Sequence, residues 1–242
     1  MTTLAAKASG PAVTVVRMDH LQFAWPGRNA FAIAIDDFSL AAGERVLLVG
    51  PSGSDKSTFL SLLCGIASPQ SGRIEVLGTD FTALPGPGRD RFRAEHFGII
   101  FQMFNLLPYG TAVDNIVLPL AFARTRRQRA TRAGDVRATA LTLMQRLGLD
   151  EKLGCQEAAK LSVGQQQRVA AARALIGAPE IIVADEPTSA LDRDRQATFL
   201  DVLFAQVKDA GATLIMVSHD ESLAPRFDRV VRLNEIAQEV GA

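Results

Sequence analysis

The sequence predicts an α/β fold with a parallel sheet, an antiparallel β layer that leads into it, and an inserted α-helical subdomain. Three short runs rich in Val, Ile and Leu are bounded by polar or turn residues, which is typical of strands buried on both faces of a parallel sheet. A polar segment follows each run, and ligand sites in open α/β sheets lie at the carboxyl ends of the strands. The runs are Val46–Val49, Ile181–Ala184 and Leu214–Val217, and the polar segments are Gly50–Thr58, Asp185–Asp192 and Ser218–Asp220.

The rest of the chain predicts the other two layers. Val13–Ala24 and Phe31–Leu40 are β-rich and are joined by a turn around Pro26-Gly27, which indicates an antiparallel β layer. Apolar residues recur near helical period in Asp135–Leu147, so residues 103–163 are predicted to be a helical insertion. We expect a flexible tail over residues 1–12 and one domain over 13–242, with its core in 13–102 and 164–242.

Composition narrows the class of protein. The chain has 242 residues, 48% of them apolar, and its 26 basic residues balance 26 acidic ones. Disorder over the whole chain is therefore excluded, and nucleic acid is not an expected partner. No apolar run approaches the ~18 residues of a membrane helix, and the N-terminus lacks a signal-peptide core. Cys64 and Cys155 match no metal or redox spacing, and we interpret both as reduced small hydrophobes of a cytosolic protein.

The segment Arg124–Arg137 is unusually rich in arginine and has two interpretations. It carries arginine at positions 124, 126, 127, 129, 132 and 137. One interpretation is a patch for an anionic lipid or a partner. The other is a solvated face of the helical insertion, which the balanced charge of the whole chain favours.

The first polar segment predicts the phosphate-binding loop of a P-loop NTPase with a RecA-like core. It lies between a predicted strand and a predicted helix, Ser57–Ile66, so that backbone N–H groups converge on an anion. Lys56 would place its charge on the β- and γ-phosphates of ATP, and Ser57 would offer its hydroxyl to Mg²⁺. The nucleotide-binding residues of the loop are Gly50, Pro51, Ser52, Gly53, Ser54, Asp55, Lys56, Ser57 and Thr58.

Asp55 departs from the pattern of this loop, G-x-x-x-x-G-K-[ST], because it replaces the second glycine. Aspartate tolerates left-handed backbone geometry, so the loop can still form. A carboxylate at about 5 Å from a phosphate charge is repelled by roughly 3 kcal/mol at an effective dielectric constant near 20. We therefore expect weaker ATP binding, slower turnover or both. The alternative function is a module impaired in nucleotide binding or in catalysis.

The second polar segment supplies two adjacent carboxylates. Asp185 is expected to hold Mg²⁺, and Glu186 to orient or deprotonate the attacking water. A strand that ends in a solvated acidic turn is the simpler interpretation of an isolated Asp-Glu pair. The continuation through Pro187–Asp192 favours the catalytic one.

Over nearly its full length the chain resembles the ATP-binding cassette (ABC) ATPases. Leu161-Ser162-Val163-Gly164-Gln165 resembles the family signature, with Val163 where glycine is usual. It continues through Gln166–Leu175, as the signature helix of the family does. The combination of this signature with Asp185–Asp192 is highly specific. The resemblance implies an ATP hydrolase that uses ATP and Mg²⁺.

The resemblance also implies roles for single residues. Gln102 resembles the glutamine that senses Mg²⁺ and water, and His219 resembles the switch histidine that contacts the γ-phosphate. Trp25 resembles the aromatic residue that stacks on adenine, a partly buried surface aromatic being the alternative. Ser189–Asp192 resembles the segment that crosses the dimer interface.

The signature implies a second subunit. Ser162, Gly164, Gln165 and the first N–H groups of the signature helix would close on the γ-phosphate held by the Lys56 loop of the other subunit. The expected assembly is a head-to-tail pair, most simply a homodimer.

One branch of the family is the best match. Phe101–Pro108 and Val113–Leu120 resemble the ATPase subunits of lipoprotein-release and macrolide- or peptide-export systems. That branch implies a permease partner, a peripheral position at the cytoplasmic face of the inner membrane, and export or extraction of lipid-linked or hydrophobic cargo. A soluble ABC protein of DNA repair or translation is disfavoured, because the chain has neither a long coiled-coil insertion nor a second cassette.

Overall fold

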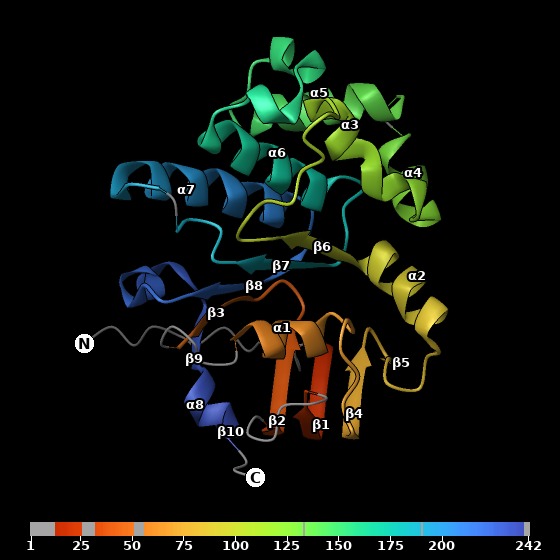
Figure 1. Ribbon diagram of the computed structural model, residues 1–242, viewed down its shortest axis with the longest axis vertical. Coiled ribbons are helices and arrows are strands. Elements are labelled where there is room, and N and C mark those ends of the chain that lie inside the picture. Colours follow the sequence, from red (N-terminus) through yellow and green to blue (C-terminus); the bar gives the residue numbers. More distant parts are fainter. Residues whose placement is uncertain (1–12, 26–31, 51–55, 133, 190, 240–242) are drawn as a thin grey trace, which may run out of the picture.

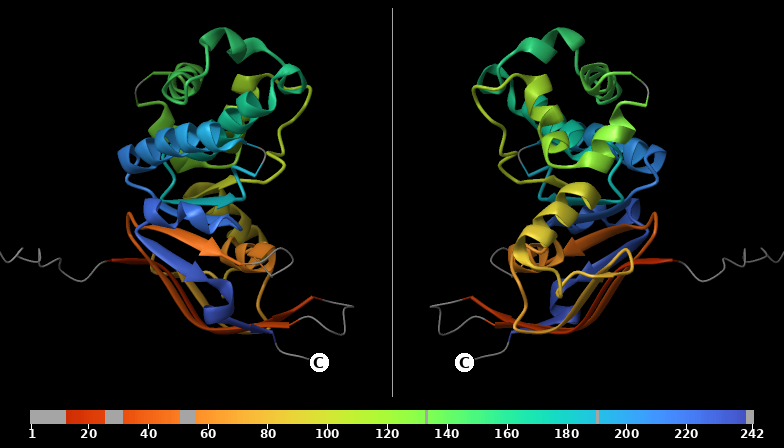
Figure 2. Two further views of the ribbon diagram at one scale, coloured as in Figure 1. Left: turned by 90° about the vertical axis from the view of Figure 1, so that its left-hand side faces the viewer. Right: turned by 90° about the vertical axis from the view of Figure 1, so that its right-hand side faces the viewer.

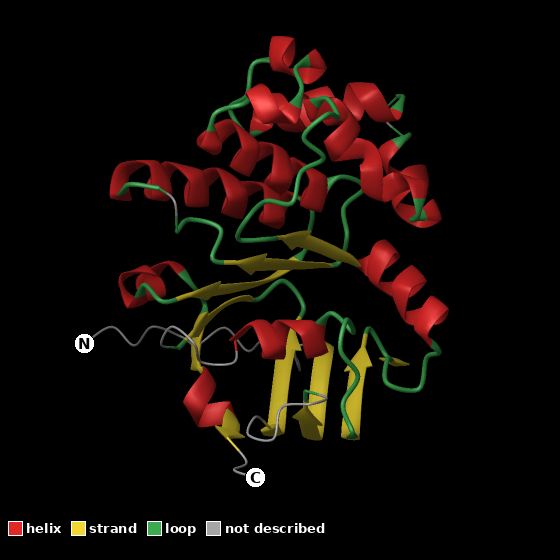
Figure 3. Ribbon diagram, viewed as in Figure 1, coloured by secondary structure: helices red, strands yellow, loops and turns green. Residues whose placement is uncertain are grey.

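The computed structural model describes residues 13–25, 32–50, 56–132, 134–189 and 191–239. The elements form three layers, with an antiparallel sheet at one end, a parallel sheet in the middle and a group of helices at the other end (Figures 1 and 3). Views turned by 90° show the same succession of layers (Figure 2). The predicted fold class is thus confirmed.

The parallel sheet contains the three predicted strands. Its order is β6-β7-β8-β3-β9, and every neighbouring pair is parallel. The predicted runs correspond to β3, β7 and β8, each one or two residues longer than expected. The bounds are β3 Arg45–Val49, β6 Phe97–Ile100, β7 Ile181–Asp185, β8 Thr213–Ser218 and β9 Arg229–Arg232.

Successive side chains of these strands enter two different hydrophobic cores. In β7, Ile182 and Ala184 pack with the helical layer, whereas Ile181 and Val183 pack with the antiparallel layer. The two-residue period of a strand causes this division. Because both faces are covered, the strands are apolar without alternation, which is the pattern that identified them in the sequence.

The antiparallel sheet has the order β10-β2-β1-β4-β5, and it shares its core with helix α1. The predicted β layer is confirmed by the pairing of β1 with β2. The turn at Pro26-Gly27 and the tail over residues 1–12 lie outside the described residues. The bounds are β1 Thr14–Ala24, β2 Ala32–Ala41, α1 Lys56–Leu63, β4 Ser71–Val76, β5 Thr79–Asp80 and β10 Ala237–Glu239.

Helices and short 3-10 turns make up the third layer and the connections. The predicted helix Asp135–Leu147 is confirmed as α5, with the Asp135 carboxylate accepting a hydrogen bond from the Ala138 N–H at its N-terminus. The bounds are α2 Gly86–His96, α3 Ala112–Val117, η1 Leu118–Ala121, α4 Arg124–Ala130, α5 Val136–Arg146, η2 Glu151–Cys155, η3 Ala158–Lys160, α6 Val163–Leu175, α7 Arg193–Asp209, η4 Glu221–Arg226 and α8 Leu233–Ile236.

Close packing seats α6 on the parallel sheet. A Cβ at Gly98 of β6 would lie 2.1 Å from the Ala174 carbonyl oxygen of α6, so only glycine allows the two backbones this approach. The buried face of α6 is rich in alanine for the same reason, with Ala170, Ala171 and Ala172 fully buried. This contact fixes α6 relative to the edge strand β6.

Two expectations about single side chains change. Arg126 is 1% exposed, so the arginine-rich segment is not a wholly solvated face. The Arg126 side chain points inward because its guanidinium donates six hydrogen bonds to backbone carbonyl oxygens. Cys64 is buried, which suits a small hydrophobe, but Cys155 is exposed at the end of the short turn η2.

Among the described residues, no helix has both the length and the apolar character needed to cross a bilayer. The division into a core over 13–102 and 164–242 and an insertion over 103–163 stays a prediction.

Candidate functional site

The carboxyl ends of three neighbouring strands bring the predicted polar segments together. In the sheet, β8 lies between β7 and β3, with Val49 opposite Ser218 and Asp185 opposite Val217. Gly50, Glu186 and His219 each follow one of these strand ends. Residues separated by more than 100 positions in the sequence thereby share one edge of the sheet.

Lys56 lies at the first position of α1 and is 6% exposed. Its ammonium donates a hydrogen bond to the Gly50 carbonyl at 2.7 Å, which bridges the start and the end of the loop. The intervening loop residues lie outside the described residues, and so does the departure at Asp55. They are Pro51, Ser52, Gly53, Ser54 and Asp55.

The remaining residues of the loop begin α1. Ser57 is exposed, so its hydroxyl is accessible to a ligand, whereas Thr58 is buried. The Trp25 indole N–H donates to the Thr58 hydroxyl at 3.1 Å, and the ring meets Phe23 edge to face. Trp25 is 37% exposed. It thus lies against the helix that follows the loop, with part of its ring open to solvent.

Glu186 and His219 form a close pair. Their Oε2 and Nδ1 atoms are 2.6 Å apart, and the Glu186 side chain is 13% exposed against 54% for His219. The backbone of Glu186 has φ +44°, a strained value for a residue with a side chain. Its N–H donates to the Val217 carbonyl at 3.1 Å, which ties the turn after β7 to β8.

Asp185 carries an unfavourable negative charge in this environment. Burial raises the pKa of its carboxyl above the ordinary value, the neighbouring Glu186 raises it further, and Lys56 opposes both effects. A divalent cation would relieve this repulsion. The Asp185 carboxylate, the Ser57 hydroxyl and the Gln102 amide offer only hard oxygen ligands, which suit Mg²⁺.

Gln102 is the predicted site residue with the fewest contacts. It is exposed in the turn after β6, and its side chain makes no hydrogen bond to another described residue. The strand β6 neighbours β7, so this turn leaves the same edge of the sheet as Asp185. Within the described residues, Lys56, Glu186 and His219 have side-chain hydrogen bonds, whereas Gln102 has none.

The signature segment starts α6. The Ser162 hydroxyl accepts from the Gln165 N–H, and the Gln165 side chain accepts from the Ser162 N–H, a reciprocal capping box. Val163 is 52% exposed, and a Cβ at Gly164 would meet nothing within 4 Å. The unusual valine therefore causes no clash within the chain, and the helix start is open to an external group.

The signature helix α6 and the helix after the phosphate loop, α1, pack on opposite faces of the parallel sheet. Helix α6 packs in the core of the helical layer, and α1 packs in the core of the antiparallel layer. Figure 1 shows α1 below β6, β7 and β8 and α6 above them. Within the described residues, the Gln167 amide also donates to the Pro187 carbonyl, joining α6 to the segment after Glu186.

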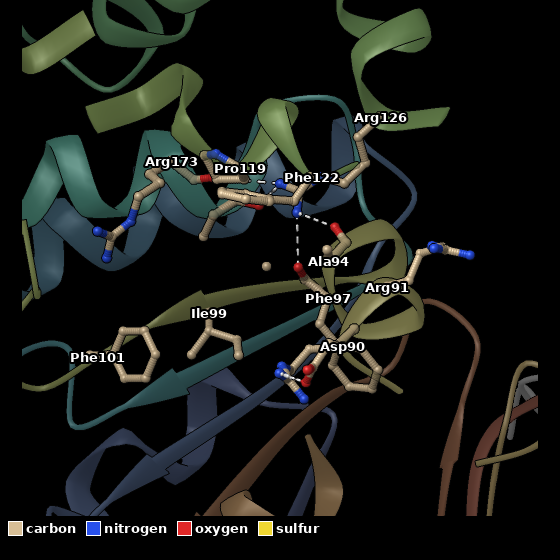
Figure 4. Close-up of a pocket in the computed structure, with 13 residues that line it drawn as sticks. Asp90, Arg91, Ala94, Phe97, Ile99, Phe101, Pro119, Phe122, Arg126 and Arg173 are labelled. Atoms are coloured by element: carbon tan, nitrogen blue, oxygen red, sulfur yellow. Dashed lines mark hydrogen bonds and ion pairs between the residues drawn. The ribbon is translucent and has the colours of Figure 1, made fainter. Parts of the chain in front are cut away.

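A groove of 510 Å³ lies between α2 and β6 on one side and η1, α4 and α6 on the other (Figure 4). Phe101, Ile99 and Phe122 supply apolar walls, and Arg126 and Arg173 lie at its helical side. Arg173 donates to the Asn105 carbonyl at 2.6 Å and so holds the turn after Gln102. We found no sequence signal for this groove, because its lining comes from five separate elements: α2, β6, η1, α4 and α6.

Comparisons with known proteins show the family of the chain. The family model described as "ABC transporter" matches residues 34–189. An uncharacterized ABC transporter ATP-binding protein of Escherichia coli K12, YbbA, is 38% identical over 92% of this chain and 96% of its own length. The lipoprotein-releasing system ATP-binding protein LolD of Novosphingobium aromaticivorans is 40% identical over 91% of this chain and 96% of its own.

Two further similarities extend these findings. The macrolide export ATP-binding/permease protein MacB 1 of Aeromonas hydrophila is 42% identical over 82% of this chain, which spans 30% of that longer protein. A solved dimer of the ATP-binding cassette MJ0796 bound to ADP and Pi superposes with a TM-score of 0.75 at 31% identity, covering 90% of this chain and 93% of that one.

Proposed function

Because this chain belongs to the ABC transporter family, we propose that it drives a membrane permease in the export or extraction of lipid-linked or hydrophobic cargo. The chain is a nucleotide-binding subunit of the LolD and MacB type with the ATPase domain of the family. The close pairing of Glu186 with His219 beside the Lys56 helix is the observation that carries the catalytic part of the proposal.

The proposed site divides the work among a few side chains. Lys56 neutralises the β- and γ-phosphates of ATP, and Ser57, Asp185 and Gln102 hold Mg²⁺. The bound cation supplies charge neutralisation to the phosphates. Glu186 accepts a proton from the attacking water, and His219 fixes the position of its carboxylate.

Two further parts of the chain would contact the adenine and the γ-phosphate of ATP. Trp25 offers a partly exposed ring beside α1, which supports a stacking role. The capped start of α6 would contact the γ-phosphate through Ser162, Gly164 and Gln165. Since α6 and α1 lie on opposite faces of the sheet, the nucleotide would be closed by a second copy of the chain, in a head-to-tail homodimer.

The groove between η1 and β6 is the proposed contact for the permease. Its apolar lining suits an apolar helix of a partner, and Arg173 joins it to the turn that follows Gln102. A partner in the groove could thus shift Gln102 towards or away from the Mg²⁺ site. This arrangement would place the protein at the cytoplasmic face of the inner membrane, held there by the permease.

The test is ATP hydrolysis by the chain together with its partner permease. We expect Mg²⁺-dependent turnover that falls by at least about 100-fold in Glu186→Gln, which keeps shape but removes the base. Nucleotide retained by this variant separates lost chemistry from lost binding. An unchanged rate in Glu186→Gln would overturn the assignment of the base.

Asp55→Gly tests the alternative of an impaired module. A rate well above that of the natural chain would show that Asp55 weakens the site, and equal rates would dismiss the alternative. Binding of a nonhydrolysable ATP analogue to both proteins distinguishes weak binding from slow chemistry.

A further inference from the structure

The arginine-rich segment divides into residues that serve the fold and residues that do not. Arg126 is buried among backbone carbonyls. Arg129 pairs with Glu180 at 2.9 Å, and Arg137 donates to the Cys155 sulfur at 3.0 Å. These three arginines are explained by contacts within the chain.

The other three are exposed, and we name them the arginine face: Arg124, Arg127 and Arg132. Arg126 and Ala130 are one turn apart on the buried side of α4, whereas Arg124 and Arg127 are exposed on the same helix and Arg132 is exposed two residues after its end. In the described part of the chain, none of its members forms an ion pair or a side-chain hydrogen bond. Arg124 and Arg127 are three residues apart, where like charges repel each other.

Among the described residues, the nearby carboxylates bond to other groups and form no ion pair with the arginine face. Glu95 accepts hydrogen bonds from the N–H groups of Thr125 and Arg126, at the first turn of α4. Glu180 is held by Arg129 and His96. The arginine face is therefore a local excess of positive charge on a chain whose formal net charge is zero.

An exposed aromatic residue adjoins this face. Phe122 is 71% exposed and precedes α4 by two residues, with the buried Ala123 between them. An apolar ring and exposed guanidinium groups therefore lie close together in the sequence. The same combination is favourable at a bilayer surface, where the ring enters the interface and the guanidinium groups contact headgroups.

The position of the arginine face also favours a bilayer surface as its partner. Phe122 and Arg126 line the groove proposed to hold the permease, and Figure 4 shows both at its helical side. Because Phe122 is 71% exposed, part of its ring is also open to solvent beside the groove. Helix α4 lies next to α2 at one edge of the molecule (Figure 1). If the groove binds the permease, as the proposed function requires, the arginine face lies next to the membrane that contains it.

We propose that Arg124, Arg127 and Arg132, together with Phe122, bind the headgroups of anionic lipids. The contact would be an electrostatic attraction of permanently charged guanidinium groups, reinforced by one inserted ring. Nucleic acid is a poorer fit, because the face is short and the chain as a whole is not basic.

Vesicle sedimentation of the full chain tests this proposal without the permease. We expect binding to vesicles of phosphatidylcholine with phosphatidylglycerol, little binding to phosphatidylcholine alone, and release at high salt. Each arginine replaced by glutamine should lower the partition coefficient about fivefold, and the triple variant about 100-fold. Phe122→Ser should weaken binding at any salt concentration.

Two control variants keep the test specific. The triple Arg→Lys variant of the arginine face keeps the charge and should bind about as well as the natural chain. Removal of three exposed cations elsewhere, by Lys152→Gln, Arg193→Gln and Lys208→Gln, should change binding far less.

Several results would overturn the proposal: equal binding to neutral vesicles, natural binding by the Gln triple, an equal loss in the control triple, or binding to duplex DNA in place of vesicles. Its failure is distinct from failure of the proposed function. ATP hydrolysis with the permease in neutral detergent depends on the nucleotide site and not on anionic lipid.

Discussion

Asp185 and Glu186 are consecutive in the chain but lie in different environments. Asp185 closes a buried strand, so its side chain follows the alternation of β7. Glu186 leaves the strand with φ +44°, which turns its side chain to within 2.6 Å of His219. A strained backbone at this position is consistent with a functional demand on the carboxylate, since strain persists only where surrounding contacts hold it.

Asp185→Asn should stabilise the nucleotide-free protein at neutral pH and abolish its Mg²⁺-dependent hydrolysis. Because the pKa of Asp185 is raised in the folded state, its ionised form opposes folding at any pH above that raised value. The amide removes this cost, and we expect Tm to rise by about 2–4 °C per kcal/mol relieved.

The pH dependence of Tm tests whether loss of the Asp185 charge causes the stabilisation. The difference between Asp185→Asn and the natural chain should shrink as the pH falls towards 3.8, the ordinary pKa of the carboxyl, because both proteins are then neutral at this position. A difference that does not vary with pH would show that packing, not charge, is responsible.

Helix α4 is too short to be stable by itself and depends on what Arg126 contacts. The guanidinium joins α4 to the ends of α2 and α6 through the carbonyls of Ala94, Ala174 and Ile176. Burial lowers its pKa to about 10, with repulsion from Arg129 adding to the effect, but the group stays charged at neutral pH. Gly177, at φ +72°, leaves the space that the Arg126 backbone occupies.

Arg126→Ala should therefore destabilise the protein by about 3 kcal/mol or more, because several buried carbonyls lose their donors. Arg124→Ala, two residues away on the exposed side, should change stability by less than about 0.5 kcal/mol. Urea denaturation measures both free energies of unfolding. Equal losses in the two variants would contradict the linking role of Arg126.

At the scale of the whole molecule, the parallel sheet separates the helix that follows the phosphate loop from the signature helix. The phosphate-loop helix belongs to one core and the signature helix to the other. In the proposed assembly, the capped start of α6 therefore contacts the nucleotide of a second copy, and a Cβ at Gly164 would meet nothing within 4 Å.

We therefore expect two copies of the chain to form a dimer when ATP is bound. Glu186→Gln with ATP and Mg²⁺ should elute as a dimer in size exclusion with light scattering, whereas the nucleotide-free protein should remain a monomer. Adding Ser162→Arg should suppress the dimer, because its bulk occupies the space of the γ-phosphate, while ATP binding to the monomer persists. A monomer in both proteins would reject the head-to-tail assembly, provided that ATP is bound.

The sequence by itself determined the family, the three buried strands, the antiparallel layer and the helix α5. These features depend on local pattern: period, apolar runs bounded by turns, and motifs whose chemistry acts through consecutive residues. It also determined that the residues after β3, β7 and β8 would share one edge, because parallel strands end on the same side.

Only the tertiary structure decided which of several similar side chains are used. Six arginines look alike in the sequence, yet Arg126 is buried, Arg129 is paired and Arg124 is exposed. The sequence also did not predict the short distance from Glu186 to His219 or the groove lined by five elements. The reason is physical. Burial, ion pairing and cavities depend on contacts between distant segments, and the sequence pattern of one segment does not specify which other segments it contacts.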